Sequence, residues 1–517
     1  MNDPQVLIAG AGPTGLILAL WLTRLGLRVR VVDPKPGPTR ETRAIAVQAR
    51  TLEFYDQLGL GQEALARGLT FDHLSLWVRA RLAGRAWLGE VGRGLTPHPY
   101  LYVLTQNENE ALLLAHLERA GGRVDWQTEL EGLSQDDSGV TVTLRGAGGE
   151  SQVRADYLAG CDGAGSAVRH ALGVGFPGGT YAQTFYVADV RATGRVRAGD
   201  LNLVLDDARF LAFFPMPGPD HYRIVGLLPP GLGEHPGFED VRPEAEARGL
   251  ARVEEVFWFS TYRVHHRVAE QFRVGRAFLL GDAAHVHTPV GGQGMNTGLG
   301  DAVNLAWKLA QALKGGNGAL LDSYEPERQP FARALVNTTD RAFDVVVDPS
   351  PTARLIRTQV APRVFPLLTR LPAVRRWLFR TASQTQIHYP ESPLSAGRAG
   401  QVQGGDRLPW VPQDGGGSNF DALRSLGWQL QVYGEPDPKV LAWCARREVA
   451  LKVFPFTPAA QRAGLTEGAL CLVRPDGHVG LVAPAFDPPT FELYAARWLP
   501  KAPSEKLHAR PEAVLLS

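Results

Sequence analysis

The chain has 517 residues, of which 44% are hydrophobic and 21% are charged. This composition is typical of a folded globular protein and excludes a disordered or collagen-like chain. At roughly 150 residues per domain, the length predicts about three structural units. The 54 Lys and Arg nearly balance the 53 Asp and Glu, so no global positive field attracts nucleic acid or a membrane, and we expect neither as a partner.

The cysteine content predicts a reducing environment. Cys161, Cys444 and Cys471 are far apart and form no CxxC pair, which argues against a disulfide framework and fits the cytoplasm. No apolar run reaches the roughly 18 to 20 residues that a membrane helix needs, and the N-terminus lacks the pattern of a signal peptide. We therefore expect a cytoplasmic protein.

The first 33 residues predict a βαβ unit. The segment 5–9 has the pattern of a buried strand, 14–25 that of an apolar helix and 28–32 that of a second strand. The turn between the first strand and the helix matches G-x-G-x-x-G, in which glycines let a pyrophosphate approach and the helix N-terminus offers N–H groups. A carboxylate at the end of the second strand can bind the ribose hydroxyls. The predicted NAD or FAD contacts are Gly10, Gly12, Pro13, Thr14, Gly15 and Asp33, and a purely structural turn is the alternative.

The pattern along the rest of the chain predicts an α/β fold in four segments. Strands and helices alternate over 1–175 and return over 273–396, which together form one domain. Short aromatic and β-branched runs over 176–272 predict an inserted, mostly antiparallel sheet that binds the substrate. The last segment, 397–517, begins with a Gly-rich and Pro-rich linker, and a further domain starts near Asn419.

Two later segments carry further chemistry. Residues 157–169 contain the turn Gly160-Cys-Asp-Gly163, and residues 276–309 contain a strand that ends in Gly281-Asp282. The second strand end places a carboxylate at the sheet edge where ligands of open α/β folds bind. The glycines over 291–294 permit close approach to a flat ring. The helix start near Asn296 can stabilise an anionic reduced flavin.

The same segment permits a second interpretation. Asp282, His285 and His287 have a spacing that can bind zinc or iron. The surrounding glycines and apolar residues suit a flavin better, and no second group of ligands is evident, so we expect no metal. For His285 alone, a packed and hydrogen-bonded histidine is the simpler interpretation.

Because the three segments occur in this order, the first 340 or so residues resemble the class A flavoprotein monooxygenases, the single-component aromatic hydroxylases with a para-hydroxybenzoate hydroxylase-like fold. The resemblance implies a Rossmann-like domain that binds FAD, with NADPH or NADH as a transient electron donor. It also implies hydroxylation of a phenolic or polycyclic aromatic by O2 through a flavin C4a-hydroperoxide. A two-electron flavin oxidoreductase without oxygen transfer and a flavin-binding regulatory protein are the alternatives.

The resemblance also implies roles for individual residues. Asp282 would accept hydrogen bonds from the ribityl chain, and Asp162 would help to hold the FAD and nicotinamide arrangement. The full set of further cofactor contacts is Lys35, Arg43, Gln106, Asp162, Gly281, Asp282, Pro289, Gly292, Gly294, Met295 and Asn296, with Arg50 a weaker candidate. Two residues depart from the family pattern, since Asp33 replaces the usual Glu and Asn109 replaces a usual Leu.

The substrate region gives a weaker signal. Phe213 and Tyr222 on the inserted sheet, together with Pro289, are the candidate substrate contacts, although an aromatic stripe on a strand is more often core. The C-terminal segment resembles a thioredoxin-like domain over 472–479 but has no CxxC dithiol. We therefore expect a structural role there, or support for a dimer or lid, in a monomer or homodimer.

Overall fold

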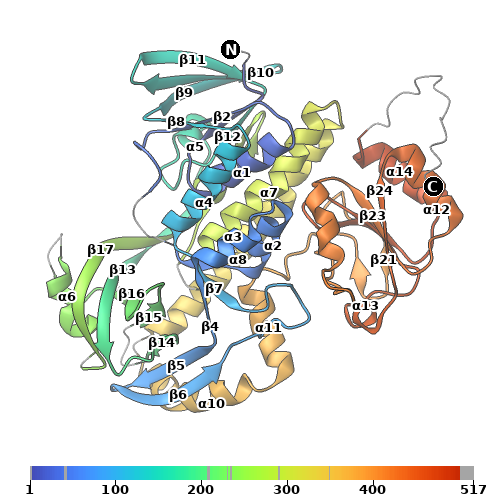
Figure 1. Cartoon of the computed structure of the whole chain (residues 1–517). Coiled ribbons are helices and arrows are strands. Elements are labelled where there is room, and N and C mark those ends of the chain that lie inside the picture. The colour runs from blue at the N-terminus through green and yellow to red at the C-terminus, as the bar shows by residue number, and fades with distance from the viewer. Residues whose placement is uncertain are drawn as a thin grey trace.

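The structure is a computed structural model that describes residues 3–39, 44–205, 210–229, 231–232, 236–247, 249–288, 291–348 and 350–500. Figure 1 shows an α/β region at the top and centre, a β-sheet region with helices along the lower edge, and a C-terminal unit at the right. Within the described ranges, no helix combines the length and apolar character needed to cross a membrane.

A six-stranded sheet forms the centre of the α/β region. In spatial order its strands are β18 (Arg273–Val274), β19 (Ala277–Leu279), β12 (Tyr157–Gly160), β1 (Val6–Ala9), β2 (Val29–Asp33) and β8 (Val124–Trp126). Neighbouring strands are parallel except β18 and β19. The predicted βαβ unit is therefore present, and strands from both sides of the inserted segment share one sheet.

Helices and a second sheet cover this centre. Helix α1 (Pro13–Arg24) packs against α4 (Gln106–Arg119) and α7 (Gly294–Leu313), and residues 15–22 of α1 are all buried. The remaining elements are α2 (Ala49–Gln57), α3 (Gly61–Arg67), α5 (Ala167–Ala171), β9 (Glu129–Asp136), β10 (Gly139–Gly146) and β11 (Gly149–Ala155). Buried apolar residues of β10 join the same core as β1 and α1.

The predicted antiparallel sheet is present and extends beyond the inserted segment. Its eight strands, in spatial order, are β20 (His285–Val286), β17 (Ala251–Val268), β13 (Gly178–Gly194), β16 (His221–Leu227), β15 (Leu211–Pro215), β14 (Leu201–Val204), β5 (His73–Val78) and β6 (Arg81–Trp87). Only β14 and β5 pair in parallel. The sequence pattern did not assign β5 and β6 to this sheet, because they precede it by about a hundred residues.

Shorter elements join the two sheets. Helix α6 (Phe238–Ala245) covers one face of the eight-stranded sheet. A small sheet of β3 (Ala46–Val47), β7 (Leu101–Val103) and β4 (Leu69–Phe71) packs on the other face. After the 3-10 turns η1 (Gly281–Ala283) and η2 (Gly318–Ser323), the chain forms α8 (Tyr324–Val347), α9 (Pro351–Leu355), the π-helical turn η3 (Ile356–Val360), α10 (Ala361–Leu368) and α11 (Pro372–Ala382).

The C-terminal unit is a four-stranded sheet flanked by helices. Its strand order is β24 (Ala450–Phe454), β23 (Gln429–Tyr433), β25 (Leu470–Val473) and β26 (Val479–Ala483), with β23 and β24 parallel and the other pairs antiparallel. The other elements are β21 (Arg398–Ala399), β22 (Val402–Gln403), η4 (Asn419–Ser425), α12 (Pro438–Arg447), α13 (Pro458–Arg462) and α14 (Pro488–Trp498). This arrangement is compatible with a thioredoxin-like unit, which stays a prediction.

The segment 397–417 is not a loose linker. Ala399, Val402, Leu408 and Val411 are buried in one cluster with the C-terminal sheet. The Gly-rich composition predicted a spacer, whereas the apolar residues between the glycines fix this segment to the unit that follows it. We therefore correct this part of the sequence interpretation.

Candidate active site

The glycine turn after β1 combines two glycines that the fold requires with one that faces open space. A methyl group on Gly10, whose φ is +101°, would collide with the Cys161 carbonyl, and one on Gly15 would collide with the Gly10 carbonyl. A methyl group on Gly12 would meet no atom within 4 Å. Pro13 is the first residue of α1, so the free N–H groups of this helix start point into the open space beside Gly12.

Asp33 at the end of β2 is buried and fixes this turn. Its Oδ2 accepts a hydrogen bond from the Ala11 N–H at 2.7 Å, and its Oδ1 accepts one from the Lys35 N–H at 2.9 Å. Each carboxylate oxygen keeps a second lone pair, so Asp33 can still accept from ribose hydroxyls. The Lys35 ammonium lies 3.7 Å from Asp33 Oδ2, which places it at the same corner of the site.

Asp162 primarily organises its own turn. Its Oδ1 accepts from the Ser166 hydroxyl at 2.6 Å and its Oδ2 from the Val168 N–H at 3.0 Å, at the start of α5. Burial raises the pKa of Asp162. Arg169, to which the sequence gave no role, donates to the carbonyls of Ala283 at 2.9 Å and Ala164 at 2.8 Å. It therefore ties the Asp162 turn to the Asp282 turn.

The Gly281-Asp282 turn is held from beneath by a buried carboxylate. Gly281 has a φ of +58° and packs on Thr14, and its N–H donates to Asp301 Oδ2 at 3.0 Å. Asp301 also pairs with His285 Nε2 at 2.8 Å and with Arg328 Nε at 2.7 Å. Burial raises the pKa of Asp301, but the charge of Arg328 and the contacts with His285 and the Gly281 N–H together lower it below its usual value. These contacts therefore fix the turn that carries the exposed Asp282.

Asn296 organises the second glycine turn and does not reach a ligand through its side chain. Its Nδ2 donates to the carbonyls of Ala46 at 2.9 Å and Gly292 at 2.8 Å. Its Oδ1 accepts from the Gln48 N–H and the Thr51 hydroxyl, both at 2.8 Å. The side chain of Asn296 therefore positions the turn, and the approach of Asn296 to the flavin stays a prediction for the backbone N–H groups at the start of α7.

Met295 and Asn109 explain one departure from the family pattern. Asn109 Oδ1 accepts from the Tyr55 hydroxyl at 2.6 Å, and its Nδ2 contacts Met295 Sδ at 3.4 Å. The amide thus links α2, α4 and the start of α7, where a Leu would make only apolar contacts. Beside it, Gly291 and Gly292 have φ values of +79° and +61°, which only glycine adopts readily.

His287 is a half-buried residue, and one of its ring nitrogens lacks a hydrogen-bond partner among the described residues. Its Nδ1 donates to the Thr288 carbonyl at 2.7 Å, because a carbonyl oxygen can only accept. Among the described residues, His287 Nε2 and Thr288 Oγ1 have no hydrogen-bond partner. A methyl group on Gly294 would lie 3.6 Å from that Nε2. Burial lowers the pKa of His287 to about 4, so Nε2 is an acceptor at neutral pH and fits a ligand that donates an N–H or O–H.

The predicted contacts Arg43, Pro289, Gln106 and Arg50 remain. Arg43 and Pro289 fall outside the described residues. Gln106 begins α4, where its Oε1 accepts from the Ala44 N–H at 3.2 Å and its Nε2 donates to Glu110 at 2.9 Å. Arg50 turns away from the glycine turns and donates to Glu53 at 2.9 Å and to the Asp476 carbonyl at 2.6 Å.

Phe213 and Tyr222 are core residues, which corrects their prediction as substrate contacts. Both are at most 2% exposed, and they pack with Phe238 and Val241 of α6. Their side chains therefore point to the covered face of the sheet. Strand alternation sends Phe214 to the opposite face, where it packs near Ile45 and Val103.

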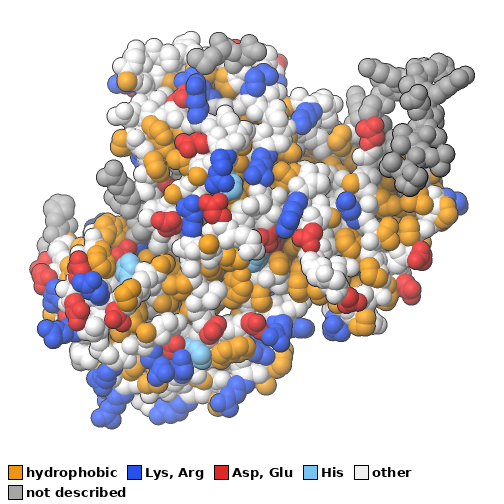
Figure 2. Space-filling view, viewed as in Figure 1, with side chains coloured by type: hydrophobic (Ala, Val, Ile, Leu, Met, Phe, Trp, Pro, Cys, Tyr) orange, Lys and Arg blue, Asp and Glu red, His pale blue; other side chains and the backbone are white. Residues whose placement is uncertain are grey.

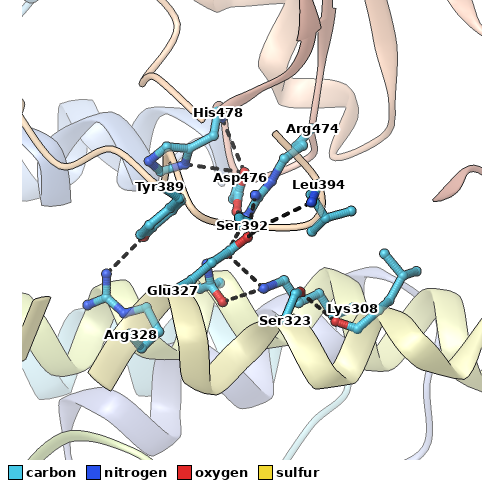
Figure 3. A network of polar contacts seen from close by, with 12 residues as sticks. Lys308, Ser323, Glu327, Arg328, Tyr389, Ser392, Leu394, Arg474, Asp476 and His478 are labelled. Atoms are coloured by element: carbon cyan, nitrogen blue, oxygen red, sulfur yellow. Dashed lines mark hydrogen bonds and ion pairs between the residues drawn. The ribbon is translucent and has the colours of Figure 1, made fainter. Parts of the chain in front are cut away.

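A buried polar network joins Glu327 and Arg328 of α8 to the C-terminal unit (Figure 3). Arg328 bridges Asp301 and the Tyr389 hydroxyl, the latter at 2.9 Å. On the adjacent residue of α8, Glu327 accepts from Arg474 Nη1 at 2.7 Å, Lys308 at 2.8 Å and the Ser392 hydroxyl at 2.6 Å. Burial raises the pKa of Glu327, but the charges of Arg474 and Lys308 hold it well below its usual range.

The histidines and carboxylates of this site do not form a metal centre. Over the described residues, no group of three or more His, Cys, Asp and Glu side chains is placed to hold a metal ion. Instead, His285 is paired with Asp301 and His287 is bound to a carbonyl. The geometry therefore presents two glycine turns, two helix N-termini and an exposed carboxylate, which suits a dinucleotide with a flat ring.

Comparisons with known proteins agree with this geometry. The family described as FAD binding domain matches residues 3–339. The 6-methylpretetramide 4-monooxygenase of Streptomyces rimosus is 36% identical, over 92% of this chain and 90% of that protein. The anhydrotetracycline hydroxylase of the same species matches the structure with a TM-score of 0.80 at 31% identity, over 96% of this chain and 99% of that one.

A third match contains a bound cofactor. The ternary complex of aklavinone-11 hydroxylase with FAD and aklavinone has a TM-score of 0.77 at 27% identity, over 97% of this chain and all of that one. The likeness thus spans the C-terminal unit as well as the α/β region. The chain belongs to the class A FAD-dependent aromatic monooxygenases, which hydroxylate aromatic substrates with FAD as cofactor and a reduced nicotinamide as electron donor.

Proposed function

We propose that this monooxygenase hydroxylates a flat polycyclic aromatic that carries phenolic or keto oxygens, with O2 as the oxidant. The observation that carries the proposal is the full-length similarity to proteins whose names specify 6-methylpretetramide, anhydrotetracycline and aklavinone. These three compounds share several fused rings with oxygen substituents. A substrate of this class needs a broad apolar face and a few polar groups that orient it.

The face of the eight-stranded sheet opposite α6 supports this substrate class. Phe214 belongs to the apolar cluster that contains Ile45. The residue after Ile45 is Ala46, whose carbonyl accepts a hydrogen bond from Asn296. This face is therefore turned toward the second glycine turn. On the same face, Phe185 and Tyr262 stack with their ring centroids 5.7 Å apart, and such a surface favours a planar aromatic partner.

A buried ion pair adds a polar group to this face. Arg223 donates to both carboxylate oxygens of Asp189 at 2.7 Å, and strand alternation places both residues on the side of Phe185. A bidentate pair of this kind has a fixed geometry. We propose that it orients a hydroxyl or keto oxygen of the substrate against the apolar surface.

For the cofactor, we propose that the two glycine turns hold FAD from both ends. Asp33 would accept from the ribose and the N-terminus of α1 beside Gly12 would bind the pyrophosphate. Asp282 would bind the ribityl chain, and the segment from His287 to the start of α7 would face the ring. When bound, FAD supplies the redox chemistry that activates O2. The protein's part is to orient both molecules and exclude water.

The proposal is tested with the FAD-loaded protein, NADPH or NADH, and a panel of polycyclic phenols and quinones under 18O2. A product that gains one labelled oxygen atom supports it. Labelled product only from small single-ring phenols would overturn the substrate class. Peroxide without labelled product from every compound would instead favour the two-electron oxidoreductase.

We further propose that the enzyme works in the cytoplasm. Cys161, Cys444 and Cys471 are free thiols, and a chain without disulfides is suited to a reducing compartment. Reduced nicotinamides are also supplied there. Fractionation of cells that express the protein would overturn this proposal if the enzyme were recovered outside the cytoplasm.

A further inference from the structure

One surface of the molecule collects most of its exposed apolar side chains. The structure describes 14 large hydrophobic residues as exposed, and ten of them lie on the helical segment 351–382 and on the adjacent β6. We call this surface the basic apolar face. Its apolar members are Leu82, Trp87, Leu355, Ile356, Val360, Val364, Leu367, Leu368, Leu371 and Trp377.

The central helix of this face is apolar on both sides. Helices α9 and α10 and the turn η3 between them continue without a break over 351–368. The inner side packs on β6, where the Pro362 carbonyl lies against Gly84 and leaves no room for a side chain there. On the outer side, Val360, Val364 and Leu367 follow the spacing of a single helix face, and the exposed Leu371 lies in the turn that follows α10. An apolar helix face normally packs against a partner, and among the described residues none buries this outer stripe.

The charges on the same surface have one sign. Segment 351–382 contains seven Arg and no Lys, Asp or Glu. Five of these Arg are exposed, namely Arg354, Arg363, Arg370, Arg376 and Arg380, and the guanidinium of Arg375 lies 5.2 Å from the ring centre of Trp87. Figure 2 shows orange and blue side chains together along the lower edge of the molecule, over β6 and α10. The partner of this face must therefore be apolar and anionic at once.

We propose that the basic apolar face binds the surface of an anionic lipid membrane. Helices that lie in a membrane interface combine Leu and Trp side chains with Arg in this way, and long Arg side chains reach headgroups while their stems stay apolar. The near-zero net charge of the chain does not oppose this binding, because attraction to anionic lipids acts within a Debye length of the surface.

Charge disfavours a second copy of this chain as the occupant. A symmetric dimer would bring the same segment of both copies together, so ten exposed Arg would meet with no carboxylate from either segment. Membrane binding is independent of which aromatic is hydroxylated, and it needs no membrane-spanning helix. It would place the enzyme where apolar polycyclic compounds accumulate.

The test is flotation of the FAD-loaded, full-length protein with vesicles of phosphatidylcholine alone or mixed with about an equal part of phosphatidylglycerol. We expect binding only to the mixed vesicles. The double variants Leu367→Ser/Trp377→Ser and Arg363→Glu/Arg370→Glu should each lower the bound fraction at limiting lipid by roughly tenfold or more. Added salt should weaken binding of the wild type.

The controls are substitutions of exposed residues elsewhere on the molecule. Leu493→Ser, at a side chain that is 75% exposed on α14, and Arg424→Glu on η4 should bind like the wild type. Failure of the wild type to float with mixed vesicles, or equal loss in the control variants, would overturn the proposal. So would a dimer in light scattering that Leu367→Ser/Trp377→Ser dissociates without any vesicle binding by the wild type.

Discussion

Two polar regions beside α7 differ in how many of their hydrogen-bonding groups have a partner in the protein. At the junction with the C-terminal unit, Lys308, Glu327, Arg474 and Asp476 bind one another and neighbouring groups. At the second glycine turn, His287 has a polar atom with no partner among the described residues. A satisfied network stabilises one packing, whereas orphan atoms beside glycines indicate a missing ligand. The comparison therefore separates structural from ligand-binding polar groups.

His478 is an exception that refines this comparison. It lies at the junction, yet neither ring nitrogen makes a hydrogen bond, although Asp476 Oδ1 is 3.4 Å from Nδ1. The adjacent cavity of about 10 Å³, lined also by Arg50, Gln384 and Tyr389, has the size of one water. Even here the space fits solvent and not a cofactor.

The largest expected effect comes from removing the central charge of the junction. Glu327→Gln leaves the buried cations of Lys308 and Arg474 without their shared carboxylate, so we expect the free energy of unfolding to fall by about 3–5 kcal/mol. Urea unfolding measures it. The control is Glu492→Gln, because this 44% exposed side chain pairs with Arg447 at the surface and should cost less than about 1 kcal/mol. Equal costs for the two variants would contradict the contrast.

The second prediction concerns the acid sensitivity of the same junction. Glu53 is buried between Arg50 and Arg407. Burial raises its pKa, but the two guanidinium groups outweigh that effect and lower the pKa from 4.5 to about 2. A carboxyl group whose pKa is lower in the folded state than in the unfolded state stabilises the folded state at pH values above the unfolded-state pKa. This stabilisation is lost as the pH falls through the folded-state pKa. Glu53 should therefore contribute about 3 kcal/mol near neutral pH.

Urea unfolding of the wild type and Glu53→Gln between neutral pH and about pH 3 checks this expectation. The gap between the two free energies of unfolding should be widest above pH 5 and should narrow as the pH falls below 4.5. A gap that stays constant with pH would show that the Glu53 carboxylate is not held in its charged form by the two arginines.

The sequence predicted the parts of this molecule that depend on local patterns. The turn from Gly10 to Gly15, the strand ends at Asp162 and Asp282, and the antiparallel insertion all follow from residue types that lie close together in the chain. These patterns identified the cofactor class, because each turn is a short run of glycines next to a strand and a helix.

Other features depend on contacts between distant segments and were not predictable. The Asn296 side chain makes hydrogen bonds with Ala46, Gln48 and Thr51, which precede it by about 250 residues. No residue close to Asn296 in the sequence indicates these partners. Alternation showed that Phe213 and Phe214 point to opposite faces, but only the position of α6 decides which face is covered. The packed segment 397–417 likewise depends on the C-terminal sheet.

The third prediction separates two glycines of one turn. Gly10→Ala should destabilise the apoprotein by at least about 1–3 kcal/mol, because its φ is +101° and its Cβ would collide with Cys161. Gly12 has a φ of −77°, and a methyl group there would meet open space. The free energy of unfolding of the Gly12→Ala apoprotein should therefore change by less than about 0.5 kcal/mol. Its FAD affinity should nevertheless fall by roughly tenfold, since the pyrophosphate needs that space.

Thermal unfolding of the apoproteins and FAD titration measured by flavin fluorescence give the two readouts. Unchanged FAD affinity in Gly12→Ala would show that the open space beside α1 is not the pyrophosphate site. A stable Gly10→Ala apoprotein would show that the turn can relax around Cys161.

The last prediction compares two histidines that are separated by one residue, His285 and His287. His285→Leu removes one of the hydrogen-bond partners of the buried Asp301 and should lower the stability of the apoprotein by about 1–3 kcal/mol. His287→Leu removes an orphan acceptor and one bond to a carbonyl, so the apoprotein should change by no more than about 1 kcal/mol. FAD affinity should fall by about two- to tenfold in His287→Leu, because the lost Nε2 faces the ligand.

The same two measurements, apoprotein unfolding and FAD titration, decide this last pair. If His287→Leu destabilises the apoprotein as much as His285→Leu and leaves FAD affinity unchanged, then the unpartnered nitrogen is a feature of packing and not of binding. If His285→Leu lowers mainly the stability and His287→Leu lowers mainly the FAD affinity, then the number of unpartnered ring nitrogens distinguishes a structural histidine from one that faces the cofactor. That criterion would then apply equally to Thr288, whose hydroxyl also lacks a partner among the described residues.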